Sequence, residues 1–409
     1  MKIGIFSDIH LGLVQYGLKE REEDFYQQYL KAINTFVEKK VDAVIIGGDV
    51  FDKPRPSPKT LQVFSKGISI LIKNNIKIFN IVGNHSMIQS SDFVTTDEFF
   101  NTFENLDSYM LLDENNKFDN EQVNIMGIPY HYNSSLDEFI EKVNIMNNSL
   151  EGSKKFNILV IHQAFKEFCG FTMEELSIND INTDNFDLIV CGHIHERKMK
   201  NLNERTVFLQ PGSLERSNVA EARDEENNGK GVFILDTDNK FIQFIPLKCN
   251  RRFLIAHMYM NKKDDLKRIK DEILEQVQND NDVPVLFLTV NDSTKSFTSL
   301  MDLIKSLNKK CLTVDFKYYD ESHKVDGNLL ENNKDILSPT ECLKIALNPF
   351  DLDEHQLGLD LYNLLQDGKD AKELLDKFII KKRKEYVDVN NQEYNYDELS
   401  QFEEFFKKI

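Results

Sequence analysis

Side chains that can bind metal ions occur in five short polar clusters, each at or just beyond the end of an apolar stretch. Five of the nine histidines belong to them. Glycines before several of these residues permit tight turns and a close approach of the backbone. The clusters are Asp8-Ile9-His10, Gly48-Asp49-Val50-Phe51-Asp52, Gly83-Asn84-His85, the single His162, and Gly192-His193-Ile194-His195.

These residue types indicate a metal-dependent hydrolase. Carboxylate, imidazole and carboxamide groups together suit Mn²⁺, Fe²⁺ or Zn²⁺, and the clusters contain no cysteine of the kind that holds a structural zinc. Seven such ligands suit two ions that share one bridging ligand, an arrangement used for in-line attack on phosphorus. Any one cluster alone is more often a simple polar turn. The five clusters in order therefore predict phosphoester hydrolysis.

The elements expected around these clusters form a layered α/β sheet. Short apolar runs typical of strands recur up to about residue 250, and side chains at the carboxyl ends of such strands converge on one crevice. The first three runs are separated by stretches with helical spacing, residues 21–40 and 57–74. On an extended segment, residues two apart point the same way, so we expect Asp8 to act with His10 and His193 with His195. Later strands follow without long helices, which favours a sheet that is partly mixed or antiparallel.

The pattern changes after residue 248. Strand-like runs alternate with helical stretches at about residues 263–278 and 297–309, which predicts a small β-α-β-α-β domain. From about residue 339 only helical segments follow. We therefore expect three parts, with boundaries at residues 1–247, 248–325 and 326–409.

Composition narrows the possible classes of protein. The 409 residues are 41% hydrophobic and 29% charged, an ordinary globular balance. The net charge of −18 argues against unaided binding to phosphate backbones, because that binding depends on Lys and Arg. The five scattered cysteines form no disulfide or zinc-ribbon pattern, and no signal peptide or membrane span is recognisable. A cytoplasmic location is expected, which is the host cytoplasm if a phage encodes the chain.

The clusters in their order resemble the calcineurin-like metallophosphoesterase superfamily over residues 1 to about 245. Within it, SDIHLG followed by REEDFYQQYLKAI, then GDVFDKPRPSP, and above all FLQPGSLERSNVAEARDEENNGKGVFILD resemble the SbcD branch of recombination and repair nucleases, which includes meiotic recombination eleven and phage homologues. The resemblance implies a layered β-sandwich core with helices outside, a small α/β capping domain that acts on DNA, and a helical C-terminal tail.

The resemblance also implies roles for single residues. It places Asp8, His10 and His195 on one ion, and Asn84, His162 and His193 on the other. It makes Asp49 the bridging ligand and His85 the general acid. Two positions depart from the family pattern: Ser86 stands where the superfamily usually has Asp, and Asp52 stands where some family nucleases have a second catalytic histidine. His131, His257, His323 and His355 are expected to be structural or exposed.

The leading hypothesis is a two-metal DNA exonuclease and endonuclease, with Mn²⁺ as the expected ion, that acts in repair, recombination or replication. The resemblance implies an SbcC-type coiled-coil ATPase as partner, bound by the helical tail, and a homodimer within the complex. Two alternatives stay open. One is a phosphomonoesterase or small-nucleotide phosphodiesterase on the same fold, and the other is a catalytically idle scaffold that binds DNA ends.

Overall fold

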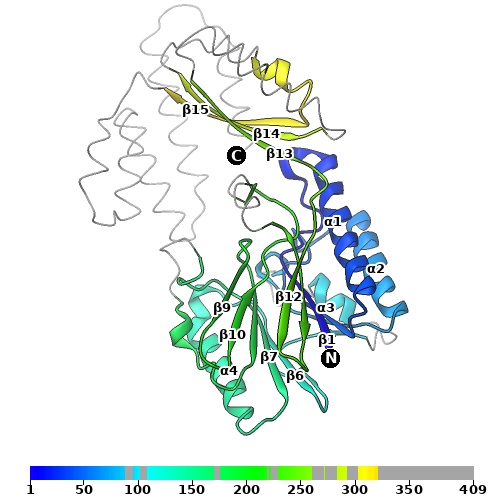
Figure 1. Ribbon diagram of the computed structural model, residues 1–409, viewed down its shortest axis with the longest axis vertical. Coiled ribbons are helices and arrows are strands. Elements are labelled where there is room, and N and C mark those ends of the chain that lie inside the picture. Colours follow the sequence, from blue (N-terminus) through cyan, green and yellow to red (C-terminus); the bar gives the residue numbers. More distant parts are fainter. Residues whose placement is uncertain are drawn as a thin grey trace, which may run out of the picture. The chain divides into compact units, whose positions relative to one another are not determined.

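The computed structural model describes most of residues 1–259 and parts of the following domain (Figure 1). The described residues are 1–87, 95–101, 108–169, 176–218, 221–222, 229–259, 271, 283–292 and 303–320. The predicted helix at 263–278 lies outside them except for residue 271, as do the predicted tail, His323 and His355. Among the described residues, no helix combines the length and the apolar composition needed to cross a bilayer.

Two six-stranded sheets form the core of the N-terminal part. In the first sheet, β1 to β4 are parallel, and β11 and β12 add antiparallel strands beside β1. Its order is β12 (Phe241–Pro246), β11 (Gly231–Asp236), β1 (Lys2–Phe6), β2 (Ala43–Ile46), β3 (Lys77–Asn80) and β4 (Tyr109–Leu111). The predicted mixed sheet is therefore confirmed.

The second sheet has parallel strands in its centre and antiparallel strands at both edges. Its order is β5 (Phe118–Asp119), β6 (Val123–Ile128), β7 (Phe156–His162), β8 (Leu188–Gly192), β10 (Val207–Gln210) and β9 (Lys198–Asn201). The central strands are buried on both faces, which is why they are continuous apolar runs in the sequence.

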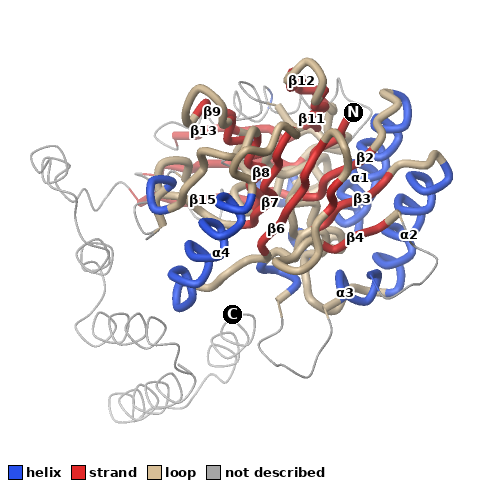
Figure 2. The backbone as a smooth tube through the Cα atoms, turned by 90° about the horizontal axis from the view of Figure 1, so that it is seen from below, coloured by secondary structure: helices blue, strands red, loops and turns tan. Residues whose placement is uncertain are grey.

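The two sheets pack face to face and helices cover their outer faces (Figure 2). Ile3 and Ile5 of β1 pack against strands of the second sheet, whereas Phe6 packs against helices on the other face. This alternation follows from the two-residue period of a strand. Helices α1 (Lys19–Glu38) and α2 (Pro58–Lys73) cover the first sheet, and α4 (Leu136–Ser149) covers the second. The layered β-sandwich is confirmed as the fold.

Short elements complete the core. They are α3 (Thr96–Asn101) and the 3₁₀ turns η1 (Gln15–Gly17), η2 (Asn84–Ser86), η3 (Asn133–Ser135) and η4 (Ile178–Asp180). Helix α2 begins where Pro58 supplies a helical φ angle and Ser57 accepts a hydrogen bond from the Thr60 amide. The helices predicted at 21–40 and 57–74 thus lie within two residues of those observed.

A separate three-stranded parallel sheet follows residue 252. It consists of β13 (Phe253–Tyr259), β14 (Val285–Asp292) and β15 (Thr313–Asp320), with helical residues at 303–307 between the last two strands. Leu286, Leu288 and Leu307 belong to its own small hydrophobic core. The four described cysteines, Cys169, Cys191, Cys249 and Cys311, are buried.

Candidate metal centre

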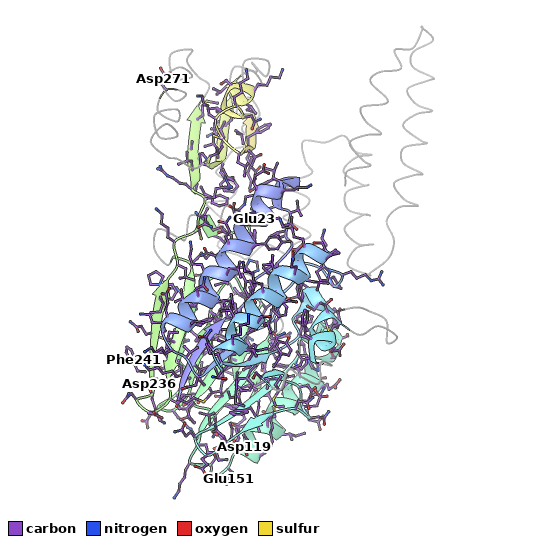
Figure 3. All side chains as sticks on the ribbon, turned by 90° about the vertical axis from the view of Figure 1, so that its right-hand side faces the viewer. Glu23, Asp119, Glu151, Asp236, Phe241 and Asp271 are labelled. Atoms are coloured by element: carbon purple, nitrogen blue, oxygen red, sulfur yellow. The ribbon has the colours of Figure 1, made fainter. Side chains whose placement is uncertain are left out.

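The predicted ligands lie where the parallel strands of both sheets end. Side chains at the opposite, amino-terminal ends include Asp119, Glu151, Asp236 and Phe241, which Figure 3 labels. At the carboxyl ends, Asp8 and His10 follow β1, Asp49 follows β2, and Asn84 follows β3. His162 is the last residue of β7, and His193 and His195 follow β8. Both sheets therefore contribute to one edge.

The structure brings these side chains together in two groups. Asp8, His10 and His195 offer ligand atoms within 4.8 Å of one another, as do Asp49, His162 and His193. Asn84 joins the second group, because its Oδ1 atom lies 3.0 Å from His162 Nε2 and 2.8 Å from His193 Nδ1. Each group contains residues that the resemblance assigns to one ion, while Asp49, the implied bridging ligand, is grouped with His162 and His193; the ligand roles stay a prediction.

Four of these residues have left-handed backbone conformations. Asp8, His10, Asp49 and His193 have φ angles of 50°, 48°, 49° and 94°. The expectation of extended segments at Asp8–His10 and His193–His195 is therefore wrong: a left-handed residue turns the chain at each point, so His193 and His195 enter different groups. Such conformations are uncommon without glycine and gather at functional sites.

Two glycines are required by close contacts. A Cβ atom on Gly48, which has a φ angle of +94°, would lie 2.4 Å from His162 Nδ1. A Cβ atom on Gly83 would lie 2.2 Å from Asp49 Oδ1. These distances are too short for any side chain, so the glycines let the strand-end loops pack against the ligands.

Hydrogen bonds fix which nitrogen of each imidazole faces the centre. His162 Nδ1 donates to the Gly47 carbonyl oxygen at 2.8 Å, which leaves the Nε2 atom facing Asn84 and Asp49. His195 Nδ1 donates to Glu221 Oε1 at 3.0 Å, which leaves its Nε2 atom 2.9 Å from His10 Nε2. Metal-binding histidines are oriented by such partners.

The donor atoms fit divalent cations. Nε2 of His162 faces Asn84 Oδ1 at 3.0 Å and Asp49 Oδ2 at 3.2 Å, so three electron-rich atoms meet where only a proton or a cation can lie between them. The Nε2 atoms of His10 and His195 also face each other, so a proton or a cation must lie between them as well. Imidazole, carboxylate and carboxamide donors are the set that borderline divalent ions prefer.

Burial and the neighbouring side chains shift the pKa values of the histidines in these groups. Burial, and then the neighbouring His195, lower the pKa of His10 to about 3. Burial and the neighbouring His162 lower the pKa of His193 to about 4. Burial alone would lower the pKa of His162 as well, but the Asp49 carboxylate raises it to about 9. The protein therefore holds a proton between Asp49 and His162, at a position that a metal ion would take over.

His85 lies beside the two groups and forms a third one with His10 and Asp52, in which the possible ligand atoms also lie within 4.8 Å of one another. Its Nδ1 atom is 2.8 Å from the Asp52 carbonyl oxygen and its ring lies edge-on to His10, with ring centroids 4.6 Å apart. Its backbone N–H donates to Asp49 Oδ1 at 3.0 Å. The side chain is 39% exposed, so a substrate can reach it.

The two departures from the family pattern have defined surroundings. Asp52 binds His85 through its backbone carbonyl, and its carboxylate Oδ1 is 4.0 Å from His85 Nδ1. Ser86 is buried near Asp97, a buried carboxyl group in α3 whose pKa burial raises to about 6. Asp97 also accepts a hydrogen bond from Asn80 at the end of β3.

The sequence interpretation missed Glu221, Ser217 and Lys230. Glu221 binds His195 through Oε1, and its Oε2 atom accepts hydrogen bonds from Ser213 and Lys230. All of them lie in the segment FLQPGSLERSNVAEARDEENNGK, which carried the resemblance. Nothing in its acidic pattern separates Glu221 from the neighbouring carboxylates, so only the fold could single it out.

Comparison with known proteins gives the family. Residues 1–197 match the model for calcineurin-like phosphoesterases. The DNA double-strand break repair protein Mre11 of Methanococcus maripaludis is 31% identical over 335 residues, which cover 80% of this chain and 84% of that protein. This chain belongs to the Mre11 family. Its metal-ligand candidates thus lie in the phosphoesterase part of an Mre11-family protein.

Two further similarities complete the comparison. Mre11 of Methanocaldococcus jannaschii is 28% identical over 91% of this chain and 96% of its own length. Among solved structures, a dimetal phosphatase from Danio rerio aligns over 57% of this chain and 91% of that protein, with 9% identity and a TM-score of 0.39. The similarity to the Mre11 proteins therefore extends well beyond the phosphoesterase part.

Proposed function

We propose that this protein cleaves phosphodiester bonds of DNA in double-strand break repair. The enzyme is a metal-dependent nuclease of the Mre11 family. The observation that carries the proposal is the meeting of seven donor side chains at one sheet edge, with His85 beside them. A catalytically idle scaffold would not need a full set of metal ligands. All seven proposed ligands are present at this edge, which favours the nuclease over the idle scaffold.

We propose that two Mn²⁺ ions bind in these groups. Asp8, His10 and His195 would hold one ion, Asn84, His162 and His193 would hold the other, and Asp49 would serve both. The bound ions would neutralise charge on the phosphoryl oxygens and lower the pKa of a water molecule. Glu221 and the Gly47 carbonyl oxygen keep His195 and His162 turned toward the centre.

His85 is proposed to protonate the leaving oxygen. The Asp52 carbonyl oxygen accepts a hydrogen bond from Nδ1 and so orients the ring, which leaves Nε2 to carry the transferred proton. An alkoxide is a poor leaving group, and general acid help of this kind is typically worth about 10²- to 10⁴-fold in rate. Exposure of the ring lets the proton be replaced from solvent after each cleavage.

Purified protein with end-labelled DNA tests this proposal. We expect cleavage with Mn²⁺, none after chelation, and faster turnover of DNA than of p-nitrophenyl phosphate. Faster hydrolysis of the monoester would favour the phosphomonoesterase alternative. His85→Ala should keep metal binding and lose about 10²- to 10⁴-fold on DNA, with a smaller loss on a diester with an activated aryl leaving group. Equal losses on both substrates would contradict the general-acid role.

Partners and location remain proposals from the family resemblance. An SbcC-type ATPase would bind the C-terminal tail from about residue 339, and the nuclease would act as a homodimer within that complex. Bound ions and this partner would offset the net charge of −18 at the DNA. The five scattered cysteines of the sequence, which suggest no disulfide framework, are compatible with the cytoplasm. Co-purification of the full chain, but not of residues 1–338, with the ATPase tests the partner; equal capture of both chains would contradict it.

A further inference from the structure

A series of aromatic rings leads from the proposed metal ligands to the solvent. The Tyr130 ring lies 5.6 Å from the His193 ring and 6.3 Å from the His162 ring, measured between centroids. The Tyr132 ring lies edge-on to Tyr130, 5.4 Å away. Tyr132 is 40% exposed, so its ring is open to a molecule that approaches the ligands. None of the roles described above uses it.

The backbone that carries this ring is anchored to the strands that carry the ligands. The Tyr130 N–H donates to the carbonyl oxygen of Val82, two residues before Asn84, at 3.0 Å. Gln163, which directly follows His162, donates to the His131 carbonyl oxygen at 3.2 Å and accepts from the His131 N–H at 3.4 Å. The loop is therefore fixed to both sheets beside the ligands.

The position of Tyr132 itself is set by the next turn. Its carbonyl oxygen accepts hydrogen bonds from the Ser135 N–H at 2.8 Å and from the Ser135 hydroxyl at 3.0 Å. A tyrosine side chain has only two rotatable angles before its ring, so little conformational entropy is lost when the ring makes a contact. Tyr132 is thus a pre-organised aromatic surface.

Charge around the loop favours a neutral ligand group over a phosphate. Lys142, which contacts the loop through His131 Nε2, forms ion pairs with Glu138 at 2.7 Å and Glu114 at 3.2 Å. The whole chain carries a charge of −18, so contacts with DNA that do not depend on phosphate charge gain importance. An exposed tyrosine can supply such a contact by stacking on a nucleobase.

We propose that Tyr132 stacks on an unpaired nucleobase of the substrate next to the scissile phosphate. This inference rests on the proposed function and narrows its substrate class to single-stranded or frayed DNA, because the bases inside an intact duplex already stack on one another. Stacking on a tyrosine is tolerant of base identity, since every base has a π face. The nuclease therefore distinguishes paired from unpaired nucleotides at this position without reading sequence.

A two-by-two comparison of protein and DNA tests the proposal. Wild type and Tyr132→Ala are assayed with Mn²⁺ on a single-stranded oligonucleotide and on the same oligonucleotide with stable abasic tetrahydrofuran nucleotides at and beside the cleaved bond. On normal DNA we expect Tyr132→Ala to raise KM about 5- to 150-fold, the range that loss of one stacked base gives. On abasic DNA the two proteins should have equal KM values. Tyr132→Phe should behave as wild type.

Phe241→Ala is the matched control, because Phe241 is an exposed aromatic residue at the opposite edge of the core, in β12 (Figure 3). It should leave KM unchanged on both DNAs. An equal loss for Tyr132→Ala on normal and abasic DNA would overturn the stacking proposal, while cleavage of both DNAs by wild type would leave the proposed function standing. Wild type that cleaved neither DNA would contradict the proposed function itself.

Discussion

At the scale of single residues, the centre depends on backbone conformations that residues other than glycine rarely adopt. Asp8, His10, Asp49 and His193 all have positive φ angles between 48° and 94°. Each left-handed residue costs of order 1 kcal/mol, so the surrounding hydrogen bonds must hold it. Asp8 shows how: its Oδ1 atom accepts a hydrogen bond from the His193 N–H at 2.9 Å, and Ser7 donates to its Oδ2 atom.

Glu221 is expected to influence the Mn²⁺ affinity of the proposed site that contains His195. Its carboxylate holds His195 and is itself held by Lys230 at 2.7 Å and Ser213 at 2.9 Å. Loss of such a partner typically weakens metal binding 10- to 100-fold, so we expect Glu221→Ala to weaken one Mn²⁺ site by about that factor. The other proposed site, at Asn84, His162 and His193, should change little. Calorimetric titration with Mn²⁺ resolves the two sites.

Two controls make this prediction specific. Glu221→Gln keeps an oxygen that can accept the His195 hydrogen bond, so its Mn²⁺ affinity should lie between those of wild type and Glu221→Ala. Glu204→Gln removes an exposed carboxylate and should bind as wild type does. Unchanged affinity at both sites in Glu221→Ala would show that His195 does not need this partner.

The sequence indicated which polar side chains lie together at the strand ends, but it did not indicate the partners that orient them. Asp, Asn and His at strand ends are recognisable because strand and turn patterns are local. Glu221 reaches His195 only through the fold, across 26 positions of sequence. The left-handed φ angles were missed for the same reason: no local pattern marks Asp8 or His193 as left-handed, since the long-range hydrogen bonds impose it.

At the scale of elements, a buried charge network joins α1 to the sheet that begins with β13. The Arg21 side chain is fully buried, pairs with Asp24 and donates to the Arg216 carbonyl oxygen at 2.9 Å. Its guanidinium carbon lies 4.9 Å from the Phe253 ring centroid in β13. Arg251 also binds Asp24, at 2.6 Å and 3.1 Å. These contacts attach the small sheet to the core.

Substitution of Arg21 should therefore lower the stability of the folded protein strongly. Arg21→Ala leaves the Asp24 and Glu215 carboxylates buried with one partner fewer, so we expect the free energy of unfolding to fall by about 3 kcal/mol or more. Lys155→Ala breaks an ion pair with Asp119 in which both side chains are partly exposed, and should cost about 1 kcal/mol or less. Urea denaturation of both variants measures the difference. Equal losses would show that burial adds nothing to the network.

Helices were predicted more accurately than strand pairing. The stretches 21–40 and 57–74 show an apolar stripe, and α1 and α2 follow them closely. Which strands share a sheet is set by contacts far apart in sequence, such as β11 beside β1. The apolar runs of β6, β7 and β8 resemble those of β1, β2 and β3, so composition alone does not assign them to two sheets.

At the scale of the whole molecule, the buried histidines make the stability of the metal-free protein depend on pH. The pKa values of His10 and His193, about 3 and about 4, lie below the ordinary value of about 6.5 in an unfolded chain. Between pH 6.5 and 4 the unfolded chain therefore binds protons that the folded chain does not, and stability falls as pH falls. Asp97 offsets part of this loss, because its pKa of about 6 lets the folded state bind a proton.

His162 acts in the opposite direction. Its pKa is raised to about 9, so its contribution is complete below about pH 6.5 and is lost as pH rises toward 9. We expect the chelated protein to be most stable near neutral pH and to lose about 1 kcal/mol per pH unit near pH 5.5. Urea denaturation in the presence of chelator, from pH 4.5 to 9, gives the curve. A stability that rose steadily toward pH 5 would contradict the buried, neutral state of His10 and His193.

We propose that one carboxylate, that of Asp49, contributes to both metal sites. Asp49 Oδ2 lies 3.2 Å from His162 Nε2 in one group, and the pKa of Asp49 is held below its usual range by His162 and also by His10 of the other group. Metal content per chain after equilibrium dialysis against Mn²⁺ tests the claim directly. We predict two ions in wild type and in the exposed control Asp137→Ala, and weakened binding at both sites in Asp49→Ala. An Asp49→Ala protein that retained two tightly bound ions would contradict the account.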